Sequence, residues 1–163
     1  MEYEPYQFWN NGHIASDYIK RNYPFDLEWW KEIKKIVDQK WNVLEVGCGT
    51  GIWSTKFKHY TGCDISEPLI DEARLRYPRI KFFQHDARDK LTGDYDLIFS
   101  FRSLLHTPYK DIRKVKFPDT RLLIVEPHIQ PTVEYCFKHD YEKIFGVKKL
   151  LSNSNTTMYG KGL

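Results

Sequence analysis

The chain has 163 residues, the usual size of one domain and long enough to bury a hydrophobic core. Its 41% hydrophobic and 29% charged residues are ordinary values, and the sequence contains no run of about eighteen apolar residues that would cross a membrane. The net charge of +3 is too small to argue for a nucleic-acid partner, so composition favours one globular domain without a membrane span.

The start of the chain and its cysteines bear on location and metal content. Residues 1–5 are acidic and polar, unlike a secretory signal, so we expect a cytoplasmic protein. The three cysteines, Cys48, Cys63 and Cys136, are far apart, and the six histidines show no metal-ligand spacing. We therefore expect neither a disulfide framework nor a metal site.

The first forty residues are rich in aromatic side chains. An aromatic opening, which includes Tyr3 and Trp9, is divided by the turn at 10–12 from an expected helix. These rings suit either cover for a sheet or a lid over a binding pocket, and both interpretations stay open. Residues 26–40 follow as an amphipathic packing helix, with Asp26 as its N-cap.

The next stretch is the one most suggestive of a ligand. Residues 43–46 form a short apolar strand that includes Glu45, and three alternating glycines follow it at Gly47, Gly49 and Gly51. Glycines permit backbone angles closed to other residues and remove the Cβ atoms that block close approach of a ligand. We expect a helix over 52–59 directly afterwards. A strand, a glycine turn and a helix make a nucleotide-sized crevice at the carboxyl edge of an α/β sheet.

Two further strands end in acids. Residues 60–65 read as a strand with Asp64 at its carboxyl end, and Ser66 is placed to cap a helix running to about Arg76. Residues 80–85 read as the third strand, with Asp86 directly after it. The alternation of strand, helix and strand predicts right-handed crossovers and a parallel sheet. Both acids would then lie at the same edge as the glycines.

The second half of the chain continues the alternation. We expect strands over 97–101 and 121–126, with a short helix over 111–116 between them. A helix over 133–144 follows. Residues 147–151 and 156–159, separated by Ser-Asn-Ser-Asn, read as a closing hairpin.

The acid and glycines, Glu45 and Gly47-Cys48-Gly49-Thr50-Gly51, resemble motif I of the class I S-adenosylmethionine-dependent methyltransferases. The nicotinamide-binding fingerprint would need glycine where Ile52 stands. The resemblance implies a single-domain, doubly wound α/β fold, with a seven-stranded, mostly parallel sheet, helices on both faces and the last strand antiparallel. Within the single domain 1–163, residues 1–40 would be a lid and packing helix and residues 41–163 the cofactor-binding core.

The same resemblance implies S-adenosylmethionine as cofactor and S-adenosylhomocysteine as product. Asp64 would accept the ribose hydroxyls, and Asp86 would accept the adenine amino group beside the backbone N–H of Ala87. The expected cofactor-binding residues are Glu45, Gly47, Cys48, Gly49, Gly51, Asp64, Ile65, Asp86, Ala87, Ser100 and Phe101. Two alternatives stay open: the glycine loop is a turn without a ligand, or Asp64 only caps the helix that follows it.

Catalytic residues are harder to identify from the sequence than cofactor-binding residues, because methyl transfer depends mainly on positioning of the reactants. His106 is the best candidate base and Arg102 a candidate substrate contact, while Glu126 and His128 are weaker candidates at the same edge. We expect a methyltransferase acting on a small molecule. The alternatives are an RNA- or DNA-directed methyltransferase, and a catalytically silent module that binds the cofactor or activates a partner.

Overall fold

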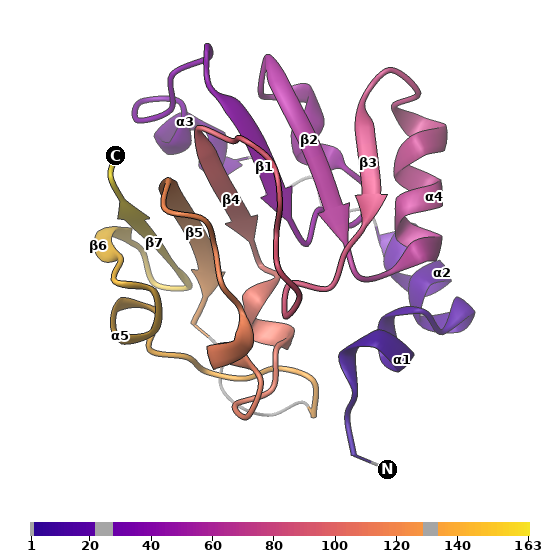
Figure 1. Ribbon diagram of the computed structural model, residues 1–163. Helices are drawn as coiled ribbons and strands as arrows, with labels where there is room; N and C mark the ends of the chain where they lie inside the picture. The colour runs from indigo at the N-terminus through magenta and orange to yellow at the C-terminus, as the bar shows by residue number, and fades with distance from the viewer. Residues whose placement is uncertain (1, 22–27, 129–133) are drawn as a thin grey trace.

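Seven strands form one sheet in the computed structural model of the chain, which describes residues 2–21, 28–128 and 134–163 (Figure 1). The strand order is β3-β2-β1-β4-β5-β7-β6, and β7 runs antiparallel to both of its neighbours. The strands are β1 Asn42–Val46, β2 His59–Asp64, β3 Lys81–Gln84, β4 Leu97–Phe101, β5 Arg121–Pro127, β6 Lys148–Ser152 and β7 Thr156–Lys161. The doubly wound α/β fold with an antiparallel last strand is therefore confirmed.

Helices and short helical turns cover the sheet. The α-helices are α1 Pro5–Trp9, α2 Gly12–Arg21, α3 Trp30–Ile33, α4 Glu67–Arg76 and α5 Tyr141–Phe145, and the 3-10 turns are η2 Ile52–Thr55, η3 Leu104–His106 and η4 Ile112–Lys114. Among the described residues no helix has the length and apolarity needed to span a membrane. Two separate clusters of buried residues form the core, one around Trp53 and Phe99 and the other around Leu44 and Ile98. Because neighbouring residues of β1 and β4 alternate between the clusters, the two faces of the sheet are packed by different elements.

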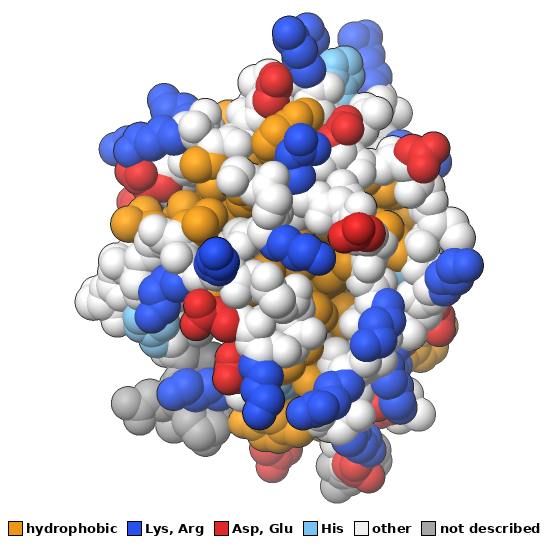
Figure 2. Space-filling view, turned by 60° about the vertical axis from the view of Figure 1, so that its left-hand side comes forward, with side chains coloured by type: hydrophobic (Ala, Val, Ile, Leu, Met, Phe, Trp, Pro, Cys, Tyr) orange, Lys and Arg blue, Asp and Glu red, His pale blue; other side chains and the backbone are white. Residues whose placement is uncertain are grey.

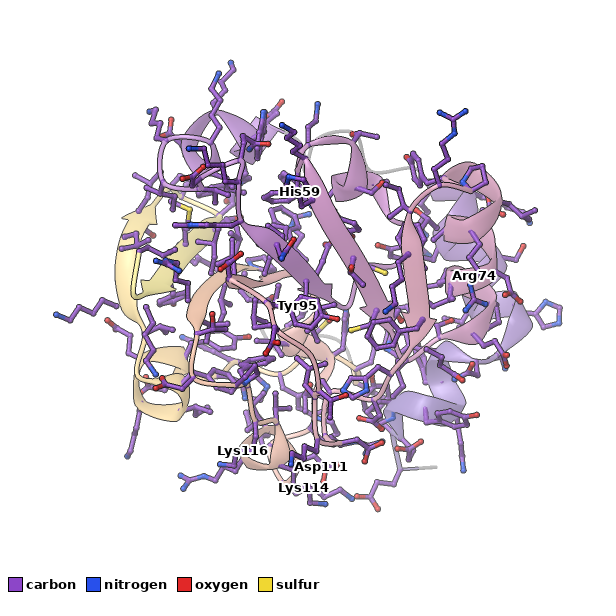
Figure 3. The ribbon with its side chains drawn as sticks, turned by 45° about the horizontal axis from the view of Figure 1, so that its top comes forward. His59, Arg74, Tyr95, Asp111, Lys114 and Lys116 are labelled. Atoms are coloured by element: carbon purple, nitrogen blue, oxygen red, sulfur yellow. The ribbon has the colours of Figure 1, made fainter. Side chains whose placement is uncertain are left out.

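Parallel pairing brings the carboxyl ends of four strands to one edge. In β1 and β2, Val46 lies opposite Cys63, so the glycine loop begins beside the end of β2. Strand β4 pairs with the other side of β1. Figure 3 shows His59 at the amino-end edge of the sheet, with Asp111 and Lys114 beyond the opposite edge. The loops after β1 to β4 therefore meet at a single site.

Three of the expected helices are shorter than the pattern predicts. Instead of 52–59, only η2 Ile52–Thr55 is helical, because His59 and Tyr60 pair with Asn42 and Val43 and already belong to β2. Of the expected helix over 26–40, α3 covers only Trp30–Ile33, and residues 34–36 are turns. Its expected cap, Asp26, lies outside the described residues. The expected helix over 111–116 is the 3-10 turn η4.

The expectation of a helix over 133–144 is wrong for most of its described part. Only α5 is helical, and its N-cap is Asp140, whose side chain accepts the N–H of Lys143. The preceding residues are held in irregular backbone, since the Phe137 N–H donates to the carbonyl of Leu105 at 2.7 Å. These long-range bonds outweigh the local helical pattern.

Candidate active site

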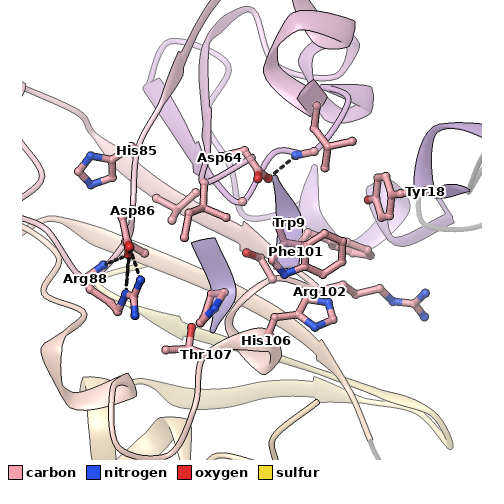
Figure 4. Close-up of a pocket in the computed structure, with 18 residues that line it drawn as sticks. Trp9, Tyr18, Asp64, His85, Asp86, Arg88, Phe101, Arg102, His106 and Thr107 are labelled. Atoms are coloured by element: carbon pink, nitrogen blue, oxygen red, sulfur yellow. Dashed lines mark hydrogen bonds and ion pairs between the residues drawn. The ribbon is translucent and has the colours of Figure 1, made fainter. Parts of the chain in front are cut away.

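A crevice opens at the carboxyl edge of the sheet, between the strand ends and the N-terminal helices (Figure 4). Its open volume is about 90 Å³, and a second cavity of about 210 Å³ adjoins it. The two share Tyr18, Gly47, Phe101, Arg102 and His106. Figure 4 shows Asp86 and Arg88 toward one end of the crevice, and Tyr18 and Arg102 toward the other.

Most of the residues expected in a cofactor site line these two spaces. The crevice is lined by Gly47, Gly49, Asp64, Ile65, Asp86, Ala87, Phe101 and His106. Glu45 and Cys48 line the adjoining cavity instead. Two expected residues line neither: Ser100 is fully buried in β4, and the Cα of Gly51 faces the ring of Phe82. The structure therefore gives Ser100 and Gly51 packing positions.

The first glycine allows an unusually close approach of two loops. Gly47 has a φ of +77°, and a Cβ built on it would lie 1.7 Å from the Oγ of Ser103. Ser103 belongs to the loop after β4, and sequence reasoning missed it because the contact is long-range. Glycine is thus required here both by backbone angle and by space.

Asp64 is buried at the end of β2 and bonds to the backbone on both sides of it. Its carboxylate accepts the N–H of Gly49 at 2.8 Å and the N–H of Ser66 at 2.9 Å. Burial raises the pKa of Asp64, and the N–H donors partly offset this rise. The side chain both fixes the glycine loop and organises the entry to α4. The lone pairs that remain on its two oxygens suit the hydroxyls of a ribose.

Asp86 begins the loop after β3 and is held by an arginine that the sequence reading did not single out. Arg88 binds it through two guanidinium nitrogens, with Nη2 at 2.6 Å from Oδ2 and Nε at 2.9 Å from both oxygens. Burial opposes ionisation of Asp86, but the hydrogen bonds and charge of Arg88 outweigh it and lower its pKa. The expected adenine acceptor is therefore an ionised carboxylate already paired with a cation.

The loop after β4 is turned by a backbone outlier. Arg102 has a φ of +50°, in the left-handed region that costs non-glycine residues energy. Its N–H donates to the carbonyl of Val125, and its guanidinium lies 5.8 Å from the ring centroid of Phe101. The turn at Arg102 directs the following loop back toward Gly47, so the strain maintains the shape of the site.

Glu126 supports this loop from β5. Its Oε1 accepts the N–H groups of Ser103 at 3.1 Å and Leu104 at 2.8 Å, while its Oε2 is buried and has no partner among the described residues. Burial raises the pKa of Glu126 to about 8. Glu126 is therefore mainly a neutral acid at pH 7, and its contacts are with the loop backbone.

Glu126→Gln is expected to stabilise the protein above pH 8 by about 1–3 kcal/mol, with little effect near pH 4.5. Between the ordinary pKa of 4.5 and the folded value of about 8, the unfolded chain is ionised while folded Glu126 keeps its proton. The free energy of unfolding thus falls as pH rises through this window, and glutamine removes that loss. Chemical denaturation of both proteins from pH 4.5 to 9 measures the difference, and parallel pH profiles would contradict a raised pKa.

His106 ends η3 and lines both the crevice and the adjoining cavity. Its Nδ1 lies 2.8 Å from the carbonyl oxygen of Tyr135. A carbonyl only accepts, so Nδ1 carries the proton and Nε2 keeps its lone pair. Burial lowers the pKa of His106 to about 4. The imidazole is neutral at physiological pH, and its ring packs edge-on against Trp9, with centroids 4.9 Å apart.

The N-terminal segment covers the crevice. Trp9, at the end of α1, donates from Nε1 to the hydroxyl of Tyr3 at 3.1 Å, and that hydroxyl donates to the carbonyl of His106 at 2.9 Å. The Oγ of Ser66 donates to the carbonyl of Trp9 at 2.5 Å. The aromatic rings thus pack against one another and Trp9 lines the crevice, while a lid over a bound cofactor stays a prediction.

The remaining candidates lie elsewhere. His128 lines a separate cavity with Glu126, and its Nε2 lies 2.7 Å from the Oγ1 of Thr157. The described residues contain no cluster of three His, Cys, Asp or Glu side chains that could hold a metal ion.

The residues present fit S-adenosylmethionine. Gly47 and Gly49 line the crevice, so backbone without a side chain borders it at these two positions. An acid stands at the end of β2 and another after β3, as a nucleoside with ribose hydroxyls and an exocyclic amine requires. Asp64, Asp86 and Gly47 would hold the ribose, adenine and methionine ends respectively.

Comparison with known proteins agrees with this fit. Residues 43–116, a little under half of the chain, match a family model described as a methyltransferase domain. No curated protein matches the chain.

Similar solved structures share the fold across nearly the whole chain. A TehB-like SAM-dependent methyltransferase from Corynebacterium glutamicum has 18% identity and a TM-score of 0.68, over 92% of this chain and 98% of that one. Magnesium protoporphyrin IX methyltransferase from Synechocystis, with bound SAH, has 16% identity and a TM-score of 0.66, over 94% and 95% of the chains. A SAM-dependent methyltransferase from Aquifex aeolicus has 16% identity and a TM-score of 0.66, over 90% and 96%. With the family match over residues 43–116, these structures show that the chain has the class I, Rossmann-like fold of S-adenosylmethionine-dependent methyltransferases.

Proposed function

We propose that the chain is an S-adenosylmethionine-dependent methyltransferase that acts on a small molecule, and that the acceptor enters the cavity beside Gly47, Phe101 and His106. The observation that carries the proposal is the roof over the crevice, where Pro5, Trp9 and Tyr18 contribute to its walls. A covered site admits a compact acceptor more readily than a folded macromolecule. The fold shared with magnesium protoporphyrin IX methyltransferase, whose substrate is a small molecule, supports the same choice.

The walls of the adjoining cavity favour an acceptor with an apolar body and one polar group. Ile52, Trp53 and Leu105 supply apolar surface, while Arg102 and His106 lie where the cavity meets the crevice. When bound, S-adenosylmethionine supplies an electrophilic methyl group on its sulfonium. The chain's own contribution is then to orient the nucleophile toward that end and to exclude water, which can supply about 7–11 kcal/mol for ideally held partners.

His106→Asn is expected to reduce turnover by about 100-fold or more while S-adenosylhomocysteine affinity stays within twofold. The lone pair on Nε2 is available to accept a hydrogen bond from the acceptor's nucleophile, and asparagine does not reproduce its position. Because the pKa of His106 is lowered to about 4, wild-type turnover should show no imidazole inflection between pH 5.5 and 8. His59→Asn is the matched control, since His59 is exposed at the amino-end edge of the sheet. Full activity in His106→Asn would remove His106 from the reaction.

Calorimetry with S-adenosylhomocysteine, followed by transfer assays with methyl-labelled cofactor, tests the proposal. Label should appear in the fraction of a cell extract below about 1 kDa and should depend on Gly47. Label that appears only in nucleic acid would contradict a small-molecule acceptor. Binding without transfer to any fraction would favour the silent module.

A nucleic-acid substrate is the second candidate, on the basis of one face of the molecule. Figure 2 shows Lys and Arg side chains spread over this face among fewer Asp and Glu side chains. Residues 101–163 hold 11 Lys and Arg against 6 Asp and Glu. Retention on RNA or DNA that falls steeply between 50 and 200 mM salt would support this candidate.

A further inference from the structure

Arg88 joins three acidic side chains at the adenine end of the crevice. Besides its bonds to Asp86, its Nη2 lies 2.8 Å from the Oε1 of Glu4, and its Nη1 lies 3.4 Å from the Oδ2 of Asp111. Figure 4 shows the guanidinium directly against Asp86. One cation thus connects the loop after β3 with the N-terminal segment and with the start of η4.

Glu4 connects Arg88 to the start of helix α1. Its Oε2 accepts the N–H of Gln7 and so caps the helix, while its Oε1 binds Arg88. The same carboxylate therefore starts α1 and ties it to the guanidinium. Through this carboxylate, Arg88 is connected to the first turn of the helix that roofs the crevice.

The cluster is partly shielded from solvent. The side chains of Arg88, Asp86 and Asp111 are 21%, 19% and 5% exposed, and that of Glu4 is 38% exposed. Ion pairs at exposed sites contribute little, but shielded, bidentate arginine pairs fix geometry. The neighbouring ion pair between Lys110 and Glu2 is much more exposed, since these two side chains are 61% and 80% exposed.

The crevice under this roof is narrow. Its open volume of about 90 Å³ and the adjoining 210 Å³ together reach only the lower end of the roughly 300–1,000 Å³ of pockets that bind small molecules. Pro5 and Trp9 of the roof line the crevice, so a cofactor bound there would lie against α1. Any outward movement of α1 would have to loosen the ion pair between Glu4 and Arg88.

We propose that Arg88 is a positioning residue for the adenine end of the cofactor. It keeps the carboxylate of Asp86 ionised and oriented toward the adenine amino group, and through Glu4 it couples that carboxylate to α1. The proposal rests on the assignment of this crevice to S-adenosylmethionine. Arg88 then links two events: binding of adenine next to Asp86, and closure of the N-terminal roof through Glu4.

The first experiment compares S-adenosylhomocysteine with S-inosylhomocysteine, which carries an oxo group in place of the adenine amino group. Wild type should prefer the amino compound by about 100-fold, because an ionised carboxylate repels the oxo group. Arg88→Gln should bind S-adenosylhomocysteine about 10- to 100-fold more weakly and lose most of this preference. Arg88→Lys should recover part of the affinity but less of the preference, since an ammonium does not hold a carboxylate through two nitrogens.

The second experiment tests the ion pair between Glu4 and Arg88 separately from the orientation of Asp86. Glu4→Gln leaves Arg88 with Asp86, so it should keep the preference for the amino compound. Hydrogen exchange at residues 5–10 should nevertheless be faster in the free protein in both Glu4→Gln and Arg88→Gln, since Arg88→Gln breaks the same ion pair and leaves the Glu4 cap in place. Cofactor association and dissociation should both accelerate. Lys110→Gln is the matched control, because it breaks only the exposed pair with Glu2 and should change none of these readouts.

Unchanged affinity and preference in a folded Arg88→Gln variant would overturn the proposal. So would unchanged exchange at residues 5–10 in Glu4→Gln. Wild-type protein that binds neither compound would instead overturn the assignment of the crevice, which keeps the two failures distinct.

Discussion

Gly47→Ala should reduce S-adenosylhomocysteine affinity by about 100-fold or more, which corresponds to about 2.8 kcal/mol. The methyl group would lie 1.7 Å from the Oγ of Ser103 and 2.3 Å from its Cβ, so the loop after β4 has to move. The N–H of Ser103 is bonded to Glu126, and this bond resists the movement. The φ of +77° adds about 1–2 kcal/mol of backbone strain for alanine.

The control separates strain from collision. Gly146→Ala has a comparable φ of +65° at the end of α5, but no atom lies within 4 Å of the added methyl. It should lose about 1–2 kcal/mol of stability and no cofactor affinity. Adding Ser103→Gly to Gly47→Ala should recover part of the lost affinity. Equal affinity in wild type and Gly47→Ala would show that the close approach of these loops does not form the site.

Asp64→Ala should lose both cofactor affinity and stability. The N–H groups of Gly49 and Ser66 would be left without an acceptor in a buried site, at about 1–3 kcal/mol each, so the free energy of unfolding should fall by about 2–5 kcal/mol. Removing the acceptor for the ribose should weaken S-adenosylhomocysteine binding by a further factor of at least about 10. Denaturation curves with and without ligand measure the two losses separately.

A graded series sharpens this result. Asp64→Asn keeps one carbonyl oxygen for the two N–H donors, so its loss of stability should be intermediate. Asp119→Ala is the control, because the Asp119 side chain is 98% exposed and its removal should change stability by less than about 0.5 kcal/mol. Wild-type affinity in a folded Asp64→Ala variant would refute the ribose assignment and leave Asp64 a structural role only.

The parts of the fold that the sequence predicts are those set by local pattern. The strand before Gly47, the acid at the end of β2 and the cap at Ser66 each depend on a few adjacent residues, and all lie in the expected elements. The expected helix after the glycines fails because β2 starts at His59, and strand pairing decides where it starts. The helix expected over 133–144 fails because bonds to the loop after β4 hold Phe137.

The residues of the site likewise fall into those that local sequence predicts and those that depend on long-range contacts. Asp64 and Asp86 stand at strand ends that alternation predicts, whereas Arg88 and Ser103 gain their importance from partners far away in the chain. Ser100 was expected at the cofactor because it is near the end of β4, but its side chain is buried in the sheet. A strand directs successive side chains to opposite faces, so nearness to a strand end does not by itself place a side chain in the crevice.

The antiparallel edge strand β6 has a consequence for the solution behaviour of the chain. All five of its residues are exposed, and its pairing with β7 shifts register between Lys149 and Leu151. An open strand edge is a template for adding another chain. The exposed side chains of Leu150 and Leu151 would favour such pairing, because it would bury their apolar surface. The irregular register and the charges of Lys148 and Lys149 oppose it, because a growing sheet would stack like charges along a distorted edge. Replacing both lysines with threonine would remove this protection and favour aggregation through β6.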